Sequence, residues 1–221
     1  MIDLTRLLAE LAMERPIFHS EADFQHALAW KLHELQPEAR IRLEYRPFPE
    51  ERVYLDIWLA GQGQAVAIEL KYLPQKFDAQ VDGERFHFKE QAAHSLGRYD
   101  FLKDLVRIER VVVNILTTFG YAILLTNDAL YWKPAARPIN IDVAFQIHEG
   151  RTIGGTFAWA AQASAGSKKG RESDLVIRGT YELHWQDYSA PSAGAYGRFR
   201  YLLVPVSRSA LSETVTPPAQ A

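Results

Sequence analysis

Three polar residues, Asp56, Glu69 and Lys71, combine types and spacing that could support chemistry. They lie in two runs, 53–60 and 65–72, in which every second residue is apolar, and a short glycine-containing linker separates the runs. Alternation of this kind predicts β-strands, and the linker predicts a tight hairpin. A hairpin that closes symmetrically about its turn places Asp56 directly opposite Glu69, with Lys71 next on the same face.

That face of the predicted hairpin places two negative charges, Asp56 and Glu69, close together. Like charges opposite each other on paired strands, at Cβ separations of about 4.5 to 5.5 Å, destabilise the pair. A divalent cation with oxygen ligands would remove the repulsion, and Lys71 could orient or deprotonate a water molecule beside it. In the alternative interpretation the face is simply exposed to solvent, and Lys71 and Arg52 relieve the repulsion between Asp56 and Glu69. The other face is apolar throughout and is predicted to belong to the core.

The composition of the chain narrows the classes of protein and of site. The chain has 221 residues, of which 48% are hydrophobic, as is normal for a globular protein. It has no cysteine, which excludes disulfides, thiolate nucleophiles and iron–sulfur clusters, so any metal must be held by oxygen or imidazole ligands. The net charge of −2 argues against a broadly basic surface but allows a local basic patch. Neither a membrane-spanning segment nor a secretory signal is recognisable, so we expect a cytoplasmic protein with no membrane partner.

The pattern along the chain predicts one α/β domain over residues 1–206, in which a mixed sheet is flanked by helices. Its core covers about 17–127 and begins with a meander of three strands, while 128–206 is a β-rich C-terminal extension and 207–221 a disordered tail. Ser20 is predicted to cap the second helix. Residues 73–97 are polar and are predicted to form a long loop or a broken helix over the site. The other predicted elements are helices at 2–14, 20–37 and 98–118 and strands at 40–46, 121–126, 176–188 and 199–206.

The chemistry-bearing residues resemble those of a known family. Asp56, twelve intervening residues and then Glu69-Leu70-Lys71, preceded by a helix that carries the acidic Glu21, resemble the PD-(D/E)XK nuclease superfamily, which has a restriction-endonuclease-like fold. The resemblance covers about residues 20–127. It departs from the family pattern at Leu55, where the motif name has proline.

The resemblance implies a role for each matching residue. Asp56 and Glu69 would bind Mg²⁺, with Mn²⁺ as a substitute, and Lys71 would act on the attacking water. Glu21 would join the metal site, and the backbone carbonyl of Leu70 is a further candidate ligand. The first turn of a helix also favours an acidic residue for electrostatic reasons alone, which is the structural alternative for Glu21.

Several other residues are weaker candidates for contacts with a substrate. Some repair-type members of the family carry Gln-x-x-x-Tyr after the lysine strand, but Gln91 is followed four positions later by Ser95, so no subfamily is assigned. The residues Asp100, Asp104 and Arg107 share one face of the long helix and could line the cleft or pair with one another, and ion pairs at the solvent-exposed surface are the favoured prediction. The candidate substrate contacts are Gln91 and Arg98, with Lys168, Lys169 and Arg171 in a glycine-flanked loop.

The sequence therefore predicts a magnesium-dependent nuclease, and the family resemblance favours DNA as the nucleic acid that it cleaves, as in an endonuclease. Motifs for zinc proteases, phosphate-binding loops and serine hydrolases do not occur in the sequence. Two alternatives have the same fold: a nucleic-acid-binding module without catalytic turnover, and a structural subunit of a complex. A homodimer or a larger complex also remains open.

Overall fold

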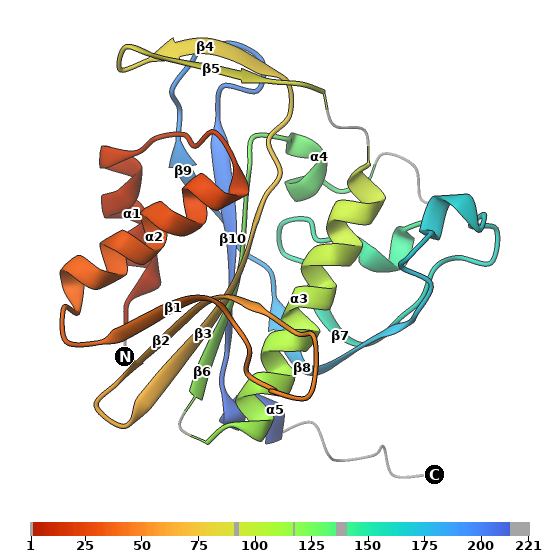
Figure 1. Cartoon of the computed structure of the whole chain (residues 1–221). Helices are drawn as coiled ribbons and strands as arrows, with labels where there is room; N and C mark the ends of the chain where they lie inside the picture. The colour runs from red at the N-terminus through yellow and green to blue at the C-terminus, as the bar shows by residue number, and fades with distance from the viewer. Residues whose placement is uncertain (1, 91–92, 117, 136–140, 213–221) are drawn as a thin grey trace.

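A six-stranded mixed sheet in the strand order β1-β2-β3-β6-β10-β9 forms the centre of the molecule (Figure 1). The structure is a computed structural model that describes residues 2–90, 93–116, 118–135 and 141–212. Only β3 and β6 are paired in parallel, and every other neighbouring pair in this sheet is antiparallel. The strands are β1 (Arg40–Tyr45), β2 (Leu55–Gly61), β3 (Gln64–Tyr72), β6 (Thr118–Thr126), β9 (Trp185–Ser189) and β10 (Phe199–Val206).

The predicted meander of the first three strands is confirmed, together with the register of its second hairpin. Ile57 pairs with Ile68, which is the register that a symmetric closure about the turn requires. The turn residues Gln62 and Gly63 have φ values of 50° and 75°. Positive φ at both central positions is typical of the type I′ turn, whose twist matches that of the two strands it joins.

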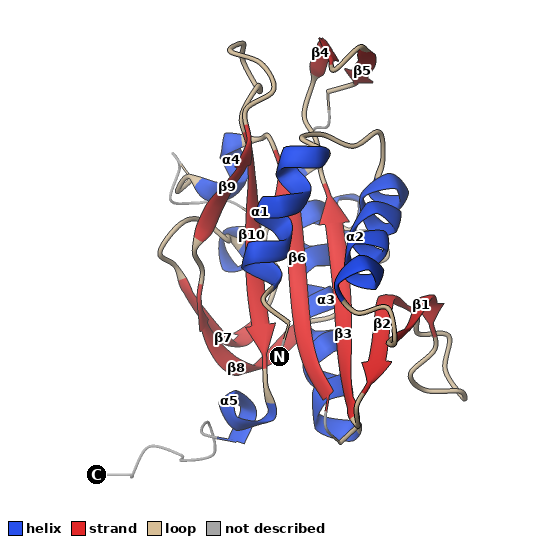
Figure 2. Cartoon of the chain, turned by 90° about the vertical axis from the view of Figure 1, so that its left-hand side faces the viewer, coloured by secondary structure: helices blue, strands red, loops and turns tan. Residues whose placement is uncertain are grey.

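Helices cover both faces of the sheet (Figure 2). On one face lie α1 (Leu4–Glu14) and α2 (Glu21–Leu35), and the Ser20 side chain caps α2 by accepting a hydrogen bond from the Asp23 N–H, as predicted. On the other face lies α3 (His94–Asn114), which packs against β3 and β6. Each face is therefore buried in its own hydrophobic core.

This second core corrects the expected position of the site. Asp56, Glu69 and Lys71 were predicted to lie on a face that is turned away from the core. That face carries Trp58 and Ala67, which are buried in the core shared with α3. The acidic residues thus lie at the border of a packed layer.

Residues 73–97 contain a second hairpin, so the predicted loop or broken helix is wrong. It consists of β4 (Phe77–Val81) and β5 (Glu84–Phe88), joined at Asp82 and Gly83, which both have positive φ. Phe86 is buried in the core beneath α1 and α2, which fixes the hairpin to the body of the molecule. The helix α3 also starts and ends four residues earlier than predicted.

The C-terminal half completes the central sheet instead of extending it. The predicted strand at 176–188 is two strands, of which β8 (Leu175–Glu182) pairs with β7 (Thr152–Phe157) in a separate small sheet. The second is β9, which pairs with β10 in the central sheet. The remaining short elements are α4 (Ala129–Trp132), the 3₁₀ turns η1 (Val143–Phe145) and η2 (Gly166–Lys168), and α5 (Arg208–Ser212).

The helix α5 lies in the segment predicted to be a disordered tail, so that prediction is wrong for residues 208–212, while 213–221 are outside the described residues. Within the described ranges, no helix combines the length and the apolar character needed to cross a membrane.

Candidate active site

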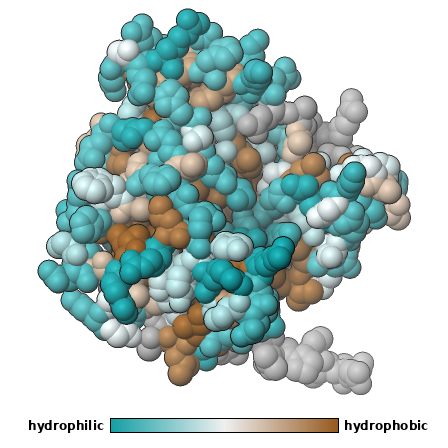
Figure 3. Space-filling view, viewed as in Figure 1, coloured by the Kyte–Doolittle hydropathy of each residue, from teal (hydrophilic) through white to brown (hydrophobic). Residues whose placement is uncertain are grey.

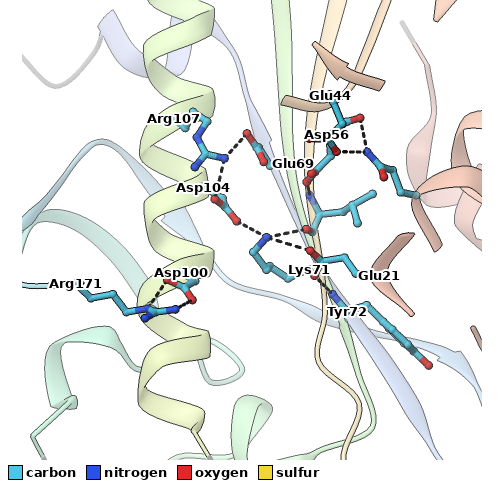
Figure 4. Close-up of polar contacts among 12 residues, drawn as sticks. Glu21, Glu44, Asp56, Glu69, Lys71, Tyr72, Asp100, Asp104, Arg107 and Arg171 are labelled. Atoms are coloured by element: carbon cyan, nitrogen blue, oxygen red, sulfur yellow. Dashed lines mark hydrogen bonds and ion pairs between the residues drawn. The ribbon is translucent and has the colours of Figure 1, made fainter. Parts of the chain in front are cut away.

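The site lies where β2 and β3 stop pairing with each other. The last paired residues of the hairpin are Ile57 and Ile68, and side chains then bind the edge of β3. Asp56 Oδ2 accepts a hydrogen bond from the Leu70 N–H at 2.7 Å, and Glu21 Oε2 accepts one from the Tyr72 N–H at 2.9 Å (Figure 4). These contacts satisfy backbone donors that a neighbouring strand would otherwise bind. Two acidic side chains are thereby held beside β3.

A groove of about 650 Å³ opens at this point between the β2–β3 hairpin and α3. Asp56, Glu69 and Lys71 all line it, so the structure brings the three predicted residues to one place. The other residues that line the groove are Glu44, Arg52, Val53, Tyr54, Asp100, Lys103, Asp104, Val106, Arg107 and Arg110.

The helix α3 adds two charged residues to the floor of the groove. Arg107 Nη1 donates to Glu69 Oε1 at 2.7 Å and lies 3.1 Å from Asp104 Oδ1. Asp104 Oδ2 lies 3.1 Å from Lys71 Nζ, in an ion pair that lacks hydrogen-bond geometry within the described structure. A chain of alternating charges therefore runs from Glu69 through Arg107 and Asp104 to Lys71.

Asp104 and Arg107 form an ion pair and line the groove, so the favoured prediction is wrong only in placing them at the solvent-exposed surface. Asp104 is only 4% exposed, and Arg107 is half-buried. The reason is that α3 is covered on two sides, by β3 and β6 and also by β8, so polar positions along it face the interior. The sequence places both residues on one face of the helix, but it does not show that this face packs against the sheet.

Burial and mutual repulsion perturb the two inner carboxyl groups. Glu69 is 1% exposed, and burial, followed by repulsion from Asp104 and Asp56, raises its pKa well above the usual value, while Arg107 opposes the rise. Burial likewise raises the pKa of Asp104 to about 6, against the opposing effects of Lys71 and Arg107. Burial is the main cause of the raised pKa of both groups, and the neighbouring carboxylates add to it.

Lys71 responds in the opposite direction. Burial alone would lower its pKa, but the carboxylates of Asp104, Glu21 and Asp56 outweigh burial, and its pKa is raised. Its Nζ also donates a hydrogen bond to the Leu70 carbonyl at 3.2 Å. The side chain is therefore held as an ammonium group at the edge of the groove.

The donor set suits a hard divalent cation, although the side chains are not arranged around one. Within the described ranges no group of three or more His, Cys, Asp or Glu side chains converges as metal ligands. Arg107 and Lys71 lie among the carboxylates instead. The available donors are all oxygen atoms, from Asp56, Glu69, Asp104 and the Leu70 carbonyl, which is the ligand type that Mg²⁺ and Mn²⁺ prefer.

Glu21 lies beside Lys71 but is not among the described residues that line the groove. Its side chain is 41% exposed, and Oε1 is 3.4 Å from Lys71 Nζ, while its other oxygen is bound to the Tyr72 N–H. It is the first residue of α2, so the helix cap at Ser20 positions it. Glu21 is therefore within reach of the site but is further out than Asp104.

The structure does not bring all the candidate substrate contacts to the groove. Arg98 is buried, and its guanidinium group binds Asp142 at 2.5 Å and the Leu130 carbonyl at 2.6 Å. Gln91 lies outside the described residues. Arg98 is not among the described residues that line the groove.

The loop that contains Lys168 and Lys169 is anchored next to the groove. Arg171 forms two hydrogen bonds with Asp100, at 2.7 and 2.6 Å, and Asp100 lines the groove (Figure 4). Lys169 is exposed, and Lys168 is half-buried. Arg171 is thus occupied in holding the loop, whereas the two lysines precede it on the same loop.

Comparison with known proteins adds no relative from which a function could be transferred. No protein-family model matches the chain, and a search of curated proteins found no match. The functional argument rests on the residues of the groove.

Proposed function

We propose that this protein is a metal-dependent nuclease of restriction-endonuclease-like fold that hydrolyses phosphodiester bonds, with DNA as the substrate favoured by the family resemblance. One observation carries the proposal. Asp56 and Glu69, from two adjacent strands, line the same groove as Lys71, and Glu69 is a buried carboxylate with a raised pKa. Burying acidic groups side by side costs stability, so their presence favours a functional role.

In the proposed site the cation would be held by Asp56, Glu69 and the Leu70 carbonyl. Glu21 would lie close by, beside Lys71. Bound Mg²⁺ would stabilise negative charge on the phosphate oxygens and lower the pKa of a water molecule. The Leu70 N–H fixes one oxygen of Asp56, and this orients the carboxylate before any ligand binds.

Lys71 acts in this proposal as a donor. Its raised pKa keeps it protonated, so it can hold a water molecule or a phosphate oxygen in line for attack but cannot remove a proton in this state. Asp104 and Glu21 contact its Nζ and determine where the ammonium group lies. We therefore assign Asp104 as a positioning residue for Lys71.

The rim of the groove suits an anionic polymer. Arg52, Lys103 and Arg110 line it and are exposed, around a floor that carries the acidic groups. In the view of Figure 3, which looks onto α3 as in Figure 1, the surface is mostly hydrophilic and its hydrophobic residues form separate patches. Cations around an acidic site can bind backbone phosphates while the metal offsets the charge of the floor.

The decisive test is cleavage by the wild type and Lys71→Ala. Both proteins are incubated with plasmid, linear duplex, single-stranded DNA and RNA, in Mg²⁺, Mn²⁺ or chelator. We expect metal-dependent cleavage by the wild type and its loss in the variant. The matched control is Lys31→Ala, because Lys31 is a partly buried lysine on α2 that is paired with Glu14 and should not affect cleavage. Equal activity of the wild type and Lys71→Ala would assign the cleavage to a contaminant or to another site.

One observation favours a second candidate, a nucleic-acid-binding module without turnover. The inner carboxylates already have partners, since Arg107 binds Glu69 and Lys71 lies beside Asp104. Calorimetric titration with Mg²⁺ separates the two functions. A binding module would bind DNA while giving no heat with Mg²⁺ and no cleavage.

A further inference from the structure

Arg107 lies between the two most deeply buried carboxylates of the site. Its Nη1 is 2.7 Å from Glu69 Oε1 and 3.1 Å from Asp104 Oδ1, so one nitrogen atom serves both groups. A single positive group that bridges two carboxylates occupies the kind of position that a divalent cation with these ligands would take. Arg107 and the proposed metal therefore both require the carboxylate of Glu69.

The two cations cannot both hold those oxygens. A guanidinium group in contact with Glu69 would repel a divalent cation bound to the same carboxylate, with little water between them to screen the charges. Without either cation, Glu69 would be an unpaired buried carboxylate, which is strongly unfavourable. An ionised Glu69 thus needs one of the two cations, and without either it would be protonated.

The side chain of Arg107 also has room to move. Its side chain is 27% exposed and lines the groove. Arg98, one of the other arginines on α3, is different, because its side chain is only 7% exposed and is bound to both Asp142 and a backbone carbonyl. The partial exposure of Arg107 leaves room for its guanidinium group to swing into the groove.

We infer that Arg107 is the resident counter-ion of the metal-free site, and that a divalent cation displaces it from Glu69 and Asp104. This inference rests on the proposed metal site. Once displaced, the guanidinium group faces the groove, where Lys103 and Arg110 are cationic neighbours. Two further carboxylates line the groove, but Asp100 is bound to Arg171 and Glu44 to Gln25, so an anionic oxygen of the substrate is a favourable partner for the displaced group. Metal binding would in this way expose a phosphate contact that the metal-free site keeps occupied.

The test measures metal binding instead of cleavage. Thermal unfolding and calorimetry with Mg²⁺ and Mn²⁺ are compared for the wild type, Arg107→Met and Arg107→Lys, with chelator as the reference. In chelator we expect Arg107→Met to unfold at a lower temperature than the wild type. Metal should then raise its unfolding temperature more than that of the wild type, and the metal Kd should tighten about tenfold, a size typical of coupling between two sites.

The matched control is Arg98→Met, which removes another buried arginine from the same helix. It should lower the unfolding temperature while leaving the metal-induced increment unchanged. Arg107→Lys retains a positive charge, so its metal-induced rise in unfolding temperature should lie between those of the wild type and Arg107→Met. If Arg107→Met does not fold, the comparison of Arg107→Lys with the wild type provides the test.

The possible results separate this inference from the proposed function. Equal metal-induced increments in the wild type and both Arg107 variants would overturn the displacement of Arg107 and leave the metal site intact. Loss of the metal response in the variants alone would also overturn it, because Arg107 would then help to build the site. Absence of any metal response in the wild type would remove the proposed metal site and, with it, this inference.

Discussion

Asp56 Oδ2 accepts the Leu70 N–H at 2.7 Å, one residue along β2 from the last pair that joins it to β3. The contact closes the open end of the hairpin and aims a carboxylate into the groove. The structural role and the proposed chemical role coincide in this one side chain, so an experiment must separate them.

Two substitutions at Asp56 should separate its structural role from its proposed role as a metal ligand. In Asp56→Asn the amide oxygen can still accept the Leu70 N–H, so we expect a change in the free energy of unfolding within about 1 kcal/mol but no stabilisation by Mg²⁺. In Asp56→Ala the donor loses its partner, which should cost a further 1 to 3 kcal/mol or so. Urea unfolding with and without Mg²⁺ measures both effects. A full response to Mg²⁺ in Asp56→Asn would contradict the role of Asp56 as a ligand.

The buried carboxyl groups predict an unusual dependence of stability on pH. The pKa of Asp104 is about 6 in the folded protein and ordinarily 3.8, so between these pH values the folded state binds more protons than the unfolded state. Stability without metal should therefore fall as the pH rises through this range, by up to about 3 kcal/mol for Asp104 alone. The raised pKa of Glu69 acts in the same direction.

Denaturant unfolding in chelator at a series of pH values measures this slope, and Asp104→Asn should flatten it. Adding Mg²⁺ should stabilise the protein most at the upper end of the range, because the ligands must be deprotonated to bind metal. A rise of stability with pH over the same range would show that these carboxyl groups are not buried as described.

A second buried acid on α3 should be purely structural. Glu109 is 1% exposed, and its carboxylate accepts hydrogen bonds from the Arg178 and Gly179 N–H groups and from the Tyr181 hydroxyl, at 2.7 to 2.9 Å. Glu109→Ala removes the acceptor from all three donors, of which the Gly179 N–H and the Tyr181 hydroxyl are buried, and should cost about 3 to 5 kcal/mol of unfolding free energy. Tyr181→Phe, which removes one donor, should cost about 1 kcal/mol.

Calorimetric titration of Tyr181→Phe with Mg²⁺ should give the Kd of the wild type, because the contact between α3 and β8 does not form the groove. A changed Kd would mean that α3 transmits strain from this contact to Asp104.

The loop lysines should contribute to nucleic-acid binding through charge alone. We expect the double variant Lys168→Ala, Lys169→Ala to bind single-stranded and duplex DNA more weakly in chelator. The slope of the logarithm of the DNA-binding constant against the logarithm of the salt concentration should become less steep. The expected change is about 1.4 to 1.8 for two lost phosphate contacts. Fluorescence anisotropy over a range of salt concentrations gives this slope. Arg6→Ala is the control, since Arg6 lies on α1, on the opposite face of the sheet, and an equal effect there would indicate non-specific attraction.

The sequence predicts those parts of the site that depend on contacts between residues close together in the chain. It does not predict the parts that depend on contacts between distant elements. The register of the β2–β3 hairpin is local, set by the turn at Gln62 and Gly63, and it was predicted correctly. That Asp104 and Arg107 face Glu69 depends on how α3 docks on the sheet, which no local pattern encodes. Polar residues on a helix are normally expected to be exposed to solvent. This rule fails on a helix that is covered on two sides.

The missed hairpin at residues 77–88 has a different cause. Asp82-Gly83 is a strong signal for a two-residue turn, and Phe86 and Phe88 alternate with polar residues after it. The many polar residues of the segment masked this pattern, because both strands bury only one face. The two strands at 175–189 were merged for the opposite reason, since nothing in the short Leu183-His184 connection marks a turn.

The strand β10 has a consequence for how the protein folds. It lies between β6 and β9, and β6 in turn pairs with the strand that carries Glu69 and Lys71. A folding chain exposes the edge of β6 until β10 pairs with it. The described residues that line the groove all lie between Glu44 and Arg110, so β10 completes the sheet behind the groove without contributing to its lining.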